Sequence, residues 1–460
     1  MGFFKRYFKN YKGQGGVKEV MFLALPMVAS TACDAVMTFT DRLFLSKLGY
    51  EQMNAAMGGG ISYQMLIFFF IGLIGYSTAL VGQYFGAKEH KKTIKTLFQS
   101  LIIVAISYPA ILILKPFVIQ IFSLIGTPKS QLPYQIEYLN ILALGSLISL
   151  FRHVISCYFT GIGKTRIVMY SALTAMLVNI FFDYIFIFGK LGLPAMGIAG
   201  AAYASIAGQI ISSLLLLIFL VKNMRENRVV FSQFARFNKE ILFKLVRYGT
   251  PAGLEMFLNF ISFAAIIAVF HSQGDVVATA ATVMFNWDLI SFVPLIGLEI
   301  AITSLAGRYM GAQKPELAHR ATISAIRIGT IYSVIILVIF IFIPEALARL
   351  FSPFEYDEVF ETAVPISASM IRIAALYVMS ESVMVSVVGA LRGAGDTFYT
   401  MLISVTAHWL FVPILIMAFN VFNFTAIQAW FLVVMFFLVF TLILYKRFKR
   451  GRWKNIKVIG

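Results

Sequence analysis

Charged residues are scarce in this chain of 460 residues. Only 13% of them are Asp, Glu, Lys or Arg, whereas a soluble domain carries about 25%. Apolar residues make up 60% of the sequence, and the mean hydropathy is +0.84. This shortage of charge excludes an ordinary soluble domain. Long apolar runs such as 101–114 and 210–221 favour segments that cross a lipid bilayer.

Cysteine and histidine are also rare. The two cysteines, Cys33 and Cys157, form no disulfide framework, and the five histidines form no metal-binding motif such as HExxH. The sequence has no phosphate-binding loop of the form GxxxxGK[ST] and no constellation of a nucleophile with its base. We therefore expect a protein that is not an enzyme, needs no cofactor and does not hydrolyse ATP.

The apolar residues gather into segments of the length that a membrane helix requires, about 20 residues. A membrane β-barrel would show shorter segments of alternating hydropathy instead. The sequence therefore predicts an all-α polytopic membrane protein with twelve transmembrane helices. Their expected ranges are 17–46, 54–83, 96–123, 135–160, 167–189, 197–221, 241–271, 278–306, 321–350, 362–391, 398–420 and 424–445.

The excess of positive charge, +17, is not spread evenly. Lys and Arg gather in the two tails and in every second loop, including the long loop near 222–240. This alternation follows the positive-inside rule, so we expect an inner-membrane protein with both termini in the cytoplasm. Binding to nucleic acid would call for a basic face on a soluble module, which the sequence does not have.

One short stretch occurs twice. GQYFGA at 82–87 returns as GRYMGA at 307–312, and the same offset of 225 residues relates Pro26 to Pro251 and Gly72 to Gly297. The sequence thus divides into two homologous six-helix bundles, 1–221 and 241–460, joined by the basic linker 222–240. Parallel repeats of this kind occur in secondary transporters, where a central cavity opens alternately to each side. Because one chain holds both halves, a monomer is sufficient. The alternative is a duplicated scaffold without transport.

Several motifs in order carry a resemblance to a known family. They are TDRLFLSKLG at 40–49, GQYFGA at 82–87, GIGKTR at 161–166, NIFFDYIFIFG at 179–189, GIAGAAYAS at 197–205 and GALRGAGDT at 389–397. Together they resemble the multidrug and toxic compound extrusion (MATE) family, most closely its bacterial NorM-like branch, over about residues 17–445. The resemblance implies twelve helices in two bundles. It also implies export of bulky, often cationic compounds against an inward gradient of H⁺ or Na⁺.

Acidic residues inside the predicted helices are the natural place to look for the chemistry. A charge at the centre of a bilayer costs roughly 2.5–3.5 kcal/mol on insertion scales, so each one is a functional hypothesis. A carboxyl group there can exchange a proton, ligate Na⁺ or pair with a cationic substrate. Seven such acids are present: Asp34, Asp41, Asp183, Glu255, Asp288, Glu299 and Glu381.

The first half holds the more regular group. Asp34 and Asp41 lie seven residues apart on one helix face, and Asn179 and Asp183 are spaced i, i+4. The resemblance places a proton or Na⁺ site at Asp41, Asn179 and Asp183, with Tyr138 nearby and Ser205 on the sixth helix. Asp34 is a secondary candidate. The alternative is that Asn179 and Asp183 only tie helices together through hydrogen bonds.

The second half departs from the family pattern. Tyr377 and Glu381 resemble a Tyr/Asp pair, but Asn259 stands where relatives carry Glu, and Glu255 lies one turn earlier. We expect a cation or substrate site formed by Glu255, Asn259, Glu299, Tyr377 and Glu381. Glu299 would supply the acid that is missing at Asn259. Alternatively, Glu299 pairs with a cation of its own bundle, such as Arg372.

These observations predict an antiporter that binds small hydrophobic or cationic compounds and contacts membrane lipid. Two other functions stay open. A flippase for lipid-linked substrates would need cations for phosphate groups, for which Arg42 and Arg152 are the membrane-embedded candidates. A receptor or binding scaffold would not need titratable acids in both bundles.

Overall fold

The computed structural model describes residues 11–124, 127–226, 236–353 and 356–459, and this part of the chain is helical without strands. Twelve helical segments in it are long and apolar enough to cross a membrane. The prediction of an all-α polytopic fold is therefore confirmed. Most of the basic residues of the N-terminal tail, and residues 227–235 of the predicted linker, lie outside the described residues.

The helices follow the predicted spans closely. Those of the first half are α2 (Val17–Ser46), α3 (Tyr50–Gly75), α4 (Ser77–Gly86), α5 (His90–Leu124), α6 (Leu132–Gly161), α7 (Thr165–Phe188) and α8 (Ile198–Glu226). Those of the second half are α10 (Lys239–His271), α11 (Asp275–Gly311), α12 (Pro315–Phe342), α13 (Pro344–Arg349), α14 (Glu358–Ala394), α15 (Thr397–Asn420), α16 (Ala426–Lys449) and the 3₁₀-helix η1 (Arg452–Asn455).

Two spans are interrupted, which the hydropathy did not indicate. The second crossing breaks at Tyr76 into α3 and α4, and the ninth ends at Phe342, before the short helix α13. Several helices begin at capping side chains that accept backbone hydrogen bonds. Asn238 accepts from Ile241, Asp357 accepts from Phe360, and Thr425 forms a capping box with Gln428. These polar caps set where the helices begin.

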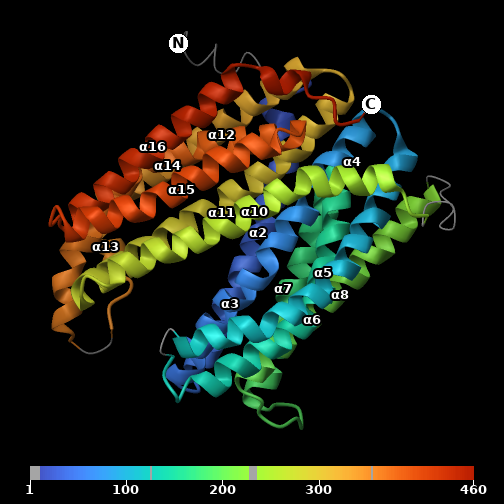
Figure 1. Ribbon diagram of the computed structural model, residues 1–460. Coiled ribbons are helices and arrows are strands. Elements are labelled where there is room, and N and C mark those ends of the chain that lie inside the picture. Colours follow the sequence, from blue (N-terminus) through green and yellow to red (C-terminus); the bar gives the residue numbers. More distant parts are fainter. Residues whose placement is uncertain (1–10, 125–126, 227–235, 354–355, 460) are drawn as a thin grey trace.

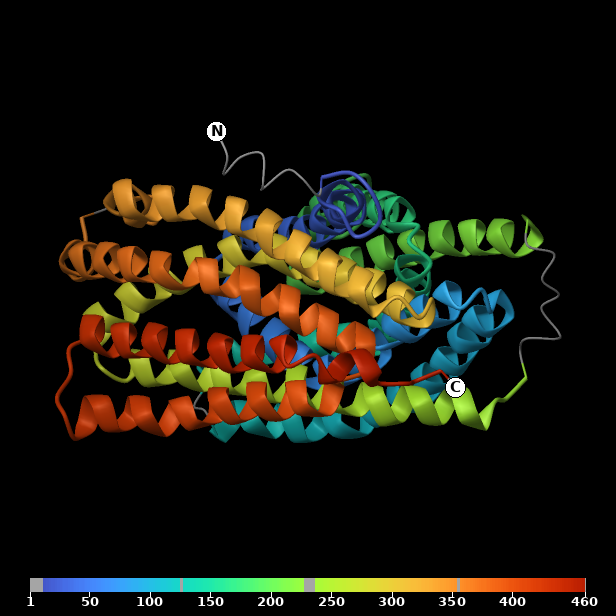
Figure 2. The same cartoon turned by 90° about the horizontal axis from the view of Figure 1, so that it is seen from above.

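The helices form two bundles, one from each half of the sequence (Figure 1). The bundles meet at the end of the molecule that carries the C terminus and diverge toward the opposite end (Figure 1). Figure 2 shows the bundle of the second half from above, with α12, α14, α15 and α16 running side by side. Across the interface, α2 packs against α11, α3 against α10, and α4 against α11.

The repeated glycines lie where the two bundles meet. A Cβ atom at Gly82 would come within 3.0 Å of the Ser304 carbonyl oxygen, and one at Gly307 within 2.8 Å of the Ala79 carbonyl oxygen. Four residues further along each helix, Gly86 and Gly311 make still closer contacts with the opposite backbone. Small residues at this spacing let helix backbones approach each other in a membrane. The repeat in the sequence is thus a reciprocal contact between α4 and α11.

A second reciprocal contact lies farther from the end at which the two bundles meet, which we call the closed end. Gly72 on α3 packs against the backbone at Ala252 on α10, and Gly297 on α11 packs against the backbone at Val28 on α2. Residues 72 and 297 occupy the same position in the two halves of the sequence. Both pairs of helices that line the space between the bundles are therefore held by glycine-to-backbone contacts.

Candidate functional site

A cavity of about 900 Å³ lies between the two bundles. Its walls come from α2, α3 and α6 of the first half and from α10, α11 and α14 of the second, with further residues from α8, α15 and α16. Of the seven acids that the sequence singled out, only Asp183 is outside the lining. The lining also includes the predicted site residues Tyr138, Ser205, Asn259 and Tyr377. Asn179 lies behind this surface.

In the first bundle, Asp41 is the centre of a buried polar cluster. Its side chain is 5% exposed, and α2 carries it to the cavity wall. Asn179 on α7 donates to one carboxylate oxygen at 3.2 Å, and Ser205 on α8 donates to the other at 3.0 Å. Asn179 also lies 3.5 Å from the Ser205 hydroxyl. Three helices thus meet through one carboxyl group.

Asp183 completes the cluster from α7. It is fully buried and interacts electrostatically with Asp41. Asp41 and Asn179 are close enough to interact with its carboxyl group, but neither carboxyl oxygen makes a hydrogen bond of standard geometry with a described residue. Tyr138 on α6 is buried within electrostatic range of both acids. Two adjacent buried carboxyl groups with so few donors call for a proton or a small cation.

Asp34 does not join this cluster. It is exposed to the cavity, two turns before Asp41 on α2, and its carboxylate lies 3.5 Å from the guanidinium of Arg152 on α6. An exposed pair at this distance contributes little to stability. Asp34 and Arg152 therefore form a separate polar spot on the wall of the first bundle.

In the second bundle, three residues form an acidic cluster across α11 and α14. The Tyr377 hydroxyl donates a hydrogen bond to the Asp288 carboxylate. Glu381, one turn along α14, interacts electrostatically with Asp288. Its Oε2 atom is buried without a hydrogen-bond partner among the described residues. The sequence marks Asp288 only as an acid within a span; its helix position gives no sign that it faces Tyr377.

A second charged group of the same bundle consists of three residues, Glu255, Glu299 and Arg392. Arg392 on α14 bridges two acids: its Nη1 lies 2.5 Å from Glu299 on α11, and its Nη2 lies 3.2 Å from Glu255 on α10. The alternative that Glu299 pairs with a cation of its own bundle is thus confirmed, but the cation is Arg392 and not Arg372, which pairs with Glu345 at 3.8 Å. The hydropathy pattern missed Arg392 because the predicted span ends at residue 391. Helix α14 continues to Ala394 and brings the guanidinium into the cavity lining.

Asn259 lies one turn after Glu255 on α10 but forms no described hydrogen bond with an acid of either group. Its amide nitrogen donates to the Ser404 hydroxyl on α15 at 2.8 Å. Its amide oxygen is buried without a partner in the described ranges. The residue therefore joins α10 to α15. It makes no described hydrogen bond with Glu255, Glu299 or Arg392.

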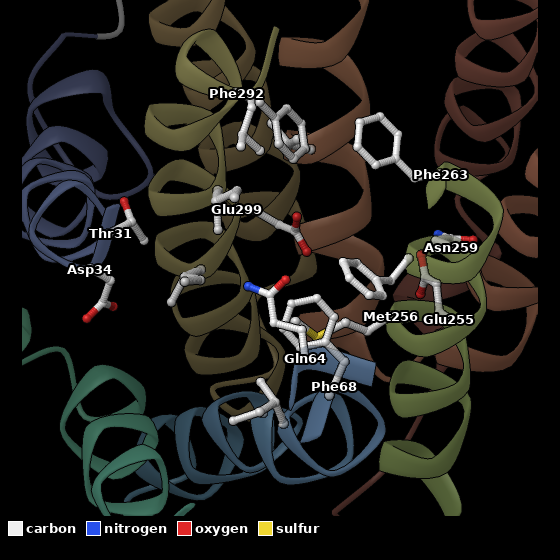
Figure 3. Close-up of a pocket in the computed structure, with 18 of the residues that line it drawn as sticks. Thr31, Asp34, Gln64, Phe68, Glu255, Met256, Asn259, Phe263, Phe292 and Glu299 are labelled. Atoms are coloured by element: carbon white, nitrogen blue, oxygen red, sulfur yellow. The ribbon is translucent and has the colours of Figure 1, made fainter. Parts of the chain in front are cut away.

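Aromatic and thioether side chains line much of the remaining wall. Phe68 of the first bundle and Phe260 of the second meet edge to face, with 4.9 Å between their ring centroids. Figure 3 shows Phe263 and Phe292 on one side of the acids and Phe68, Gln64 and Met256 on the other. Such a lining suits an apolar ligand that carries a positive charge.

The described residues contain no cluster of three or more His, Cys, Asp or Glu side chains that could hold a metal ion. Cys33 and Cys157 are buried and have free thiols. The Cys157 sulfur lies 3.6 Å from Nε2 of His153, on the preceding turn of α6.

The comparisons with known proteins agree with this architecture. The family model named MatE matches twice, at residues 26–185 and 251–417, once in each bundle. The chain is 29% identical to a probable multidrug resistance protein NorM of Thermotoga maritima, over 98% of this chain and 97% of that protein. It is 26% identical to the multidrug resistance protein PmpM of Pseudomonas aeruginosa, over 85% and 82%.

Solved structures show the same fold. A MATE crystallised in complex with MaL6 superposes with a TM-score of 0.86 at 21% identity, over 97% of this chain and 99% of the other. A MATE family transporter of the MOP superfamily, in an outward-facing conformation, superposes with a TM-score of 0.85 at 22% identity, over 97% and 98%. The family model matches both halves of the sequence, and the solved structures of this family have the same fold. The chain therefore belongs to the MATE family of multidrug efflux transporters, which are membrane proteins and not enzymes.

Proposed function

We propose that this transporter exports hydrophobic, cationic compounds in exchange for H⁺ or Na⁺. The observation that carries the proposal is the buried pair of Asp41 and Asp183, whose carboxyl groups interact while neither Asp183 oxygen makes a hydrogen bond of standard geometry with a described residue. A proton or one monovalent cation would satisfy these oxygens. Asn179, Tyr138 and Ser205 would then act as fixed neutral partners around the bound ion.

The substrate preference rests on the composition of the cavity. Six acids line it, together with aromatic rings from both bundles. Three arginines also line it, Arg42, Arg152 and Arg392, and two of them are already paired with acids. The surplus of acids favours a cationic ligand. A flippase for phosphate-bearing lipids is the weaker alternative, because such a head group would meet more acids than free cations.

The conformation and the charge pattern together support an assignment of the side to which the cavity opens. The bundles diverge away from the end that carries the C terminus (Figure 1). If the termini lie in the cytoplasm of a bacterial inner membrane, as the basic loops favour, the described state is open to the outside. Exchange then requires that the ion and the substrate prefer different states, since a ligand shifts an equilibrium only through its differential affinity.

The expected partners belong to the same proposal. The working unit is a monomer, because both bundles and the whole cavity come from one chain. Its ligands are the coupling ion, the substrate and the surrounding lipid. It needs no nucleic acid and no cofactor apart from the coupling ion.

The test is efflux of a fluorescent cation from proteoliposomes under an imposed pH gradient or an imposed Na⁺ gradient. We expect one of the two gradients to drive efflux by the unmodified protein and the Asp41→Asn variant to lose it. Asp34→Asn is the matched control, because it removes an acid from the same helix outside the buried cluster. Full gradient-driven efflux by Asp41→Asn would contradict coupling at this pair. Lack of efflux under either gradient would favour the flippase.

A further inference from the structure

The three residues Glu255, Arg392 and Glu299 have an unusual position for an ion-pair group. Each comes from a different helix, α10, α11 or α14, and all three line the cavity. Glu255 is 4% exposed, and the side chains of Glu299 and Arg392 are 17% and 24% exposed. The group is thus largely desolvated, yet open toward the space in which a substrate would lie.

Two acids share one cation in this arrangement. Arg392 uses one terminal nitrogen for each carboxylate, at Oε1 of Glu299 and Oε2 of Glu255. One guanidinium balances one of the two negative charges, so the group retains a net charge of about −1 when all three are ionised. Figure 3 shows Glu255 and Glu299 projecting from two helices into the same space, near Met256 and Phe68.

The guanidinium of Arg392 shows that the pair of acids, Glu255 and Glu299, can bind an organic cation. A cation held by two carboxylates is the interaction that a cationic substrate would make at this wall. We propose that Arg392 is a tethered competitor, which takes the place of the substrate cation between Glu255 and Glu299 in the outward-open state and so expels it. This inference rests on the proposed function, because it requires a cationic substrate.

The helices that carry the acids are placed to make this competition depend on the state of the transporter. Helix α10, with Glu255, packs against α3 of the other bundle. Helix α11, with Glu299, packs against α2 and α4 of the other bundle. A movement of one bundle against the other therefore acts on both helices, and the spacing of the two acids changes if that movement tilts or bends α10 relative to α11. Arg392 comes from α14, which lies mainly among helices of its own bundle.

The competing explanation is that Arg392 is a structural pin, a residue whose ion pairs only hold α10 and α11 to α14. Gly389, one turn before Arg392, already packs against the backbone of Glu299, and a Cβ atom at Gly389 would lie only 2.7 Å from the Glu299 carbonyl oxygen. Helices α11 and α14 are thus held together without the ion pair. The two explanations differ in their consequence for the substrate. Removal of a pin would weaken binding by loosening the site, whereas removal of a competitor would strengthen it.

The experiment measures binding and transport of tetraphenylphosphonium, a lipophilic monovalent cation, by Arg392→Ala in proteoliposomes. We expect the dissociation constant to fall about tenfold, because the net charge near the cation becomes more negative by one unit. We expect turnover to fall, because the cation is no longer expelled. Guanidinium ion at millimolar concentration, on the scale of a tethered group, should restore turnover in Arg392→Ala but not accelerate the unmodified protein. Tetramethylammonium at the same concentration controls for ionic strength.

Two further variants keep the result interpretable. Arg152→Gln removes a positive charge from the same cavity but leaves the acid pair occupied, so its effect on affinity should be much smaller. Arg392→Lys retains the charge without the planar fork and should restore part of the turnover of Arg392→Ala. If Arg392→Ala unfolds, Arg392→Gln replaces it. That variant keeps a long polar side chain without the positive charge and should bind tetraphenylphosphonium more tightly than the unmodified protein, whereas loss of a purely structural contact would leave binding unchanged or weaker.

The outcomes separate this inference from the proposed function. Unchanged or weaker binding by a folded Arg392→Ala, together with no response to guanidinium, would overturn the competitor while leaving cation export intact. Where Arg392→Gln stands in for it, unchanged or weaker binding would do the same. If the unmodified protein neither binds nor transports tetraphenylphosphonium, both proposals fail together.

Discussion

Gly86 and Gly311 each contact the backbone of the other's helix. A Cβ atom at Gly86 would collide with the Arg308 carbonyl, and one at Gly311 would collide with the Gln83 carbonyl. Residues 83 and 308 are themselves related by the repeat, as are 86 and 311. The closed end of the transporter is therefore a symmetric contact between two copies of one helix segment.

The first prediction concerns this contact. Gly86→Ala and Gly311→Ala should each destabilise the closed end by about 1–3 kcal/mol, the usual cost of overpacking. The thiol of a Ser304→Cys reporter, at a position that is fully buried here, should then react faster with a maleimide added from the C-terminal side. Gly60→Ala is the control, since a Cβ there would have nothing within 4 Å. Equal labelling rates in all three variants would exclude a role for the glycines in closure.

The second prediction separates stability from coupling at Asp183. Asp183→Asn should abolish gradient-driven efflux but raise the apparent unfolding temperature. The amide removes one of two adjacent buried acids and can donate to Asp41. Thermal unfolding of the purified protein in Na⁺-free buffer at one pH checks this. An apparent unfolding temperature equal to or below that of the unmodified protein would contradict it.

The third prediction addresses the acidic cluster of the second bundle. If Asp288 and Glu381 act together on one cation, Asp288→Asn and Glu381→Gln should each raise the KM for efflux of tetraphenylphosphonium. The double variant should raise the KM little more than either single variant does, with a coupling energy between the two sites of about 0.5–3 kcal/mol. Glu345→Gln, in the exposed pair with Arg372, is the charge control. Simple additivity of the two effects would show that the acids act independently.

The fourth prediction concerns stability at the closed end. Asp396 is 4% exposed and accepts two hydrogen bonds of 2.8 Å from Arg447, whose guanidinium also lies 3.9 Å from the ring centroid of Tyr399. Arg447→Met leaves a buried carboxylate unpaired and should cost about 3–5 kcal/mol. The exposed pair of Lys92 and Glu89 should cost less than about 1 kcal/mol when Glu89 is changed to Gln. Thermal unfolding in detergent compares the two, and similar losses would contradict the prediction.

Most of the fold was predictable from the sequence because its signals are local. Twenty or more apolar residues define a span whatever the neighbouring helices do, and the offset of 225 residues relates the two halves directly. The break at Tyr76 was not predictable, since α3 and α4 are both apolar. The end of α14 was placed three residues early, because charge at a helix end does not tell a buried Arg392 from a residue in a loop.

The candidate site was predictable only in part, because side-chain partners depend on tertiary packing. The spacing of Asn179 and Asp183 indicated a shared face, and the structure shows Asn179 in contact with Asp41. In the second bundle, composition alone did not separate Glu299, which pairs with Arg392, from Asp288, which pairs with Tyr377. Both are acids on α11, and only the packing of α14 against that helix distinguishes them.

The tether of Arg392 has a consequence for an exporter. A free ion that displaced the substrate would become less effective wherever it is dilute, and release would slow as substrate accumulates outside. A side chain fixed to α14 has a local concentration set by its length and its helix, on the order of millimolar or above. That concentration does not change with the medium. A transporter built in this way would keep its outward-facing affinity for the compound low in any medium, while the coupling ion supplies the free energy for export.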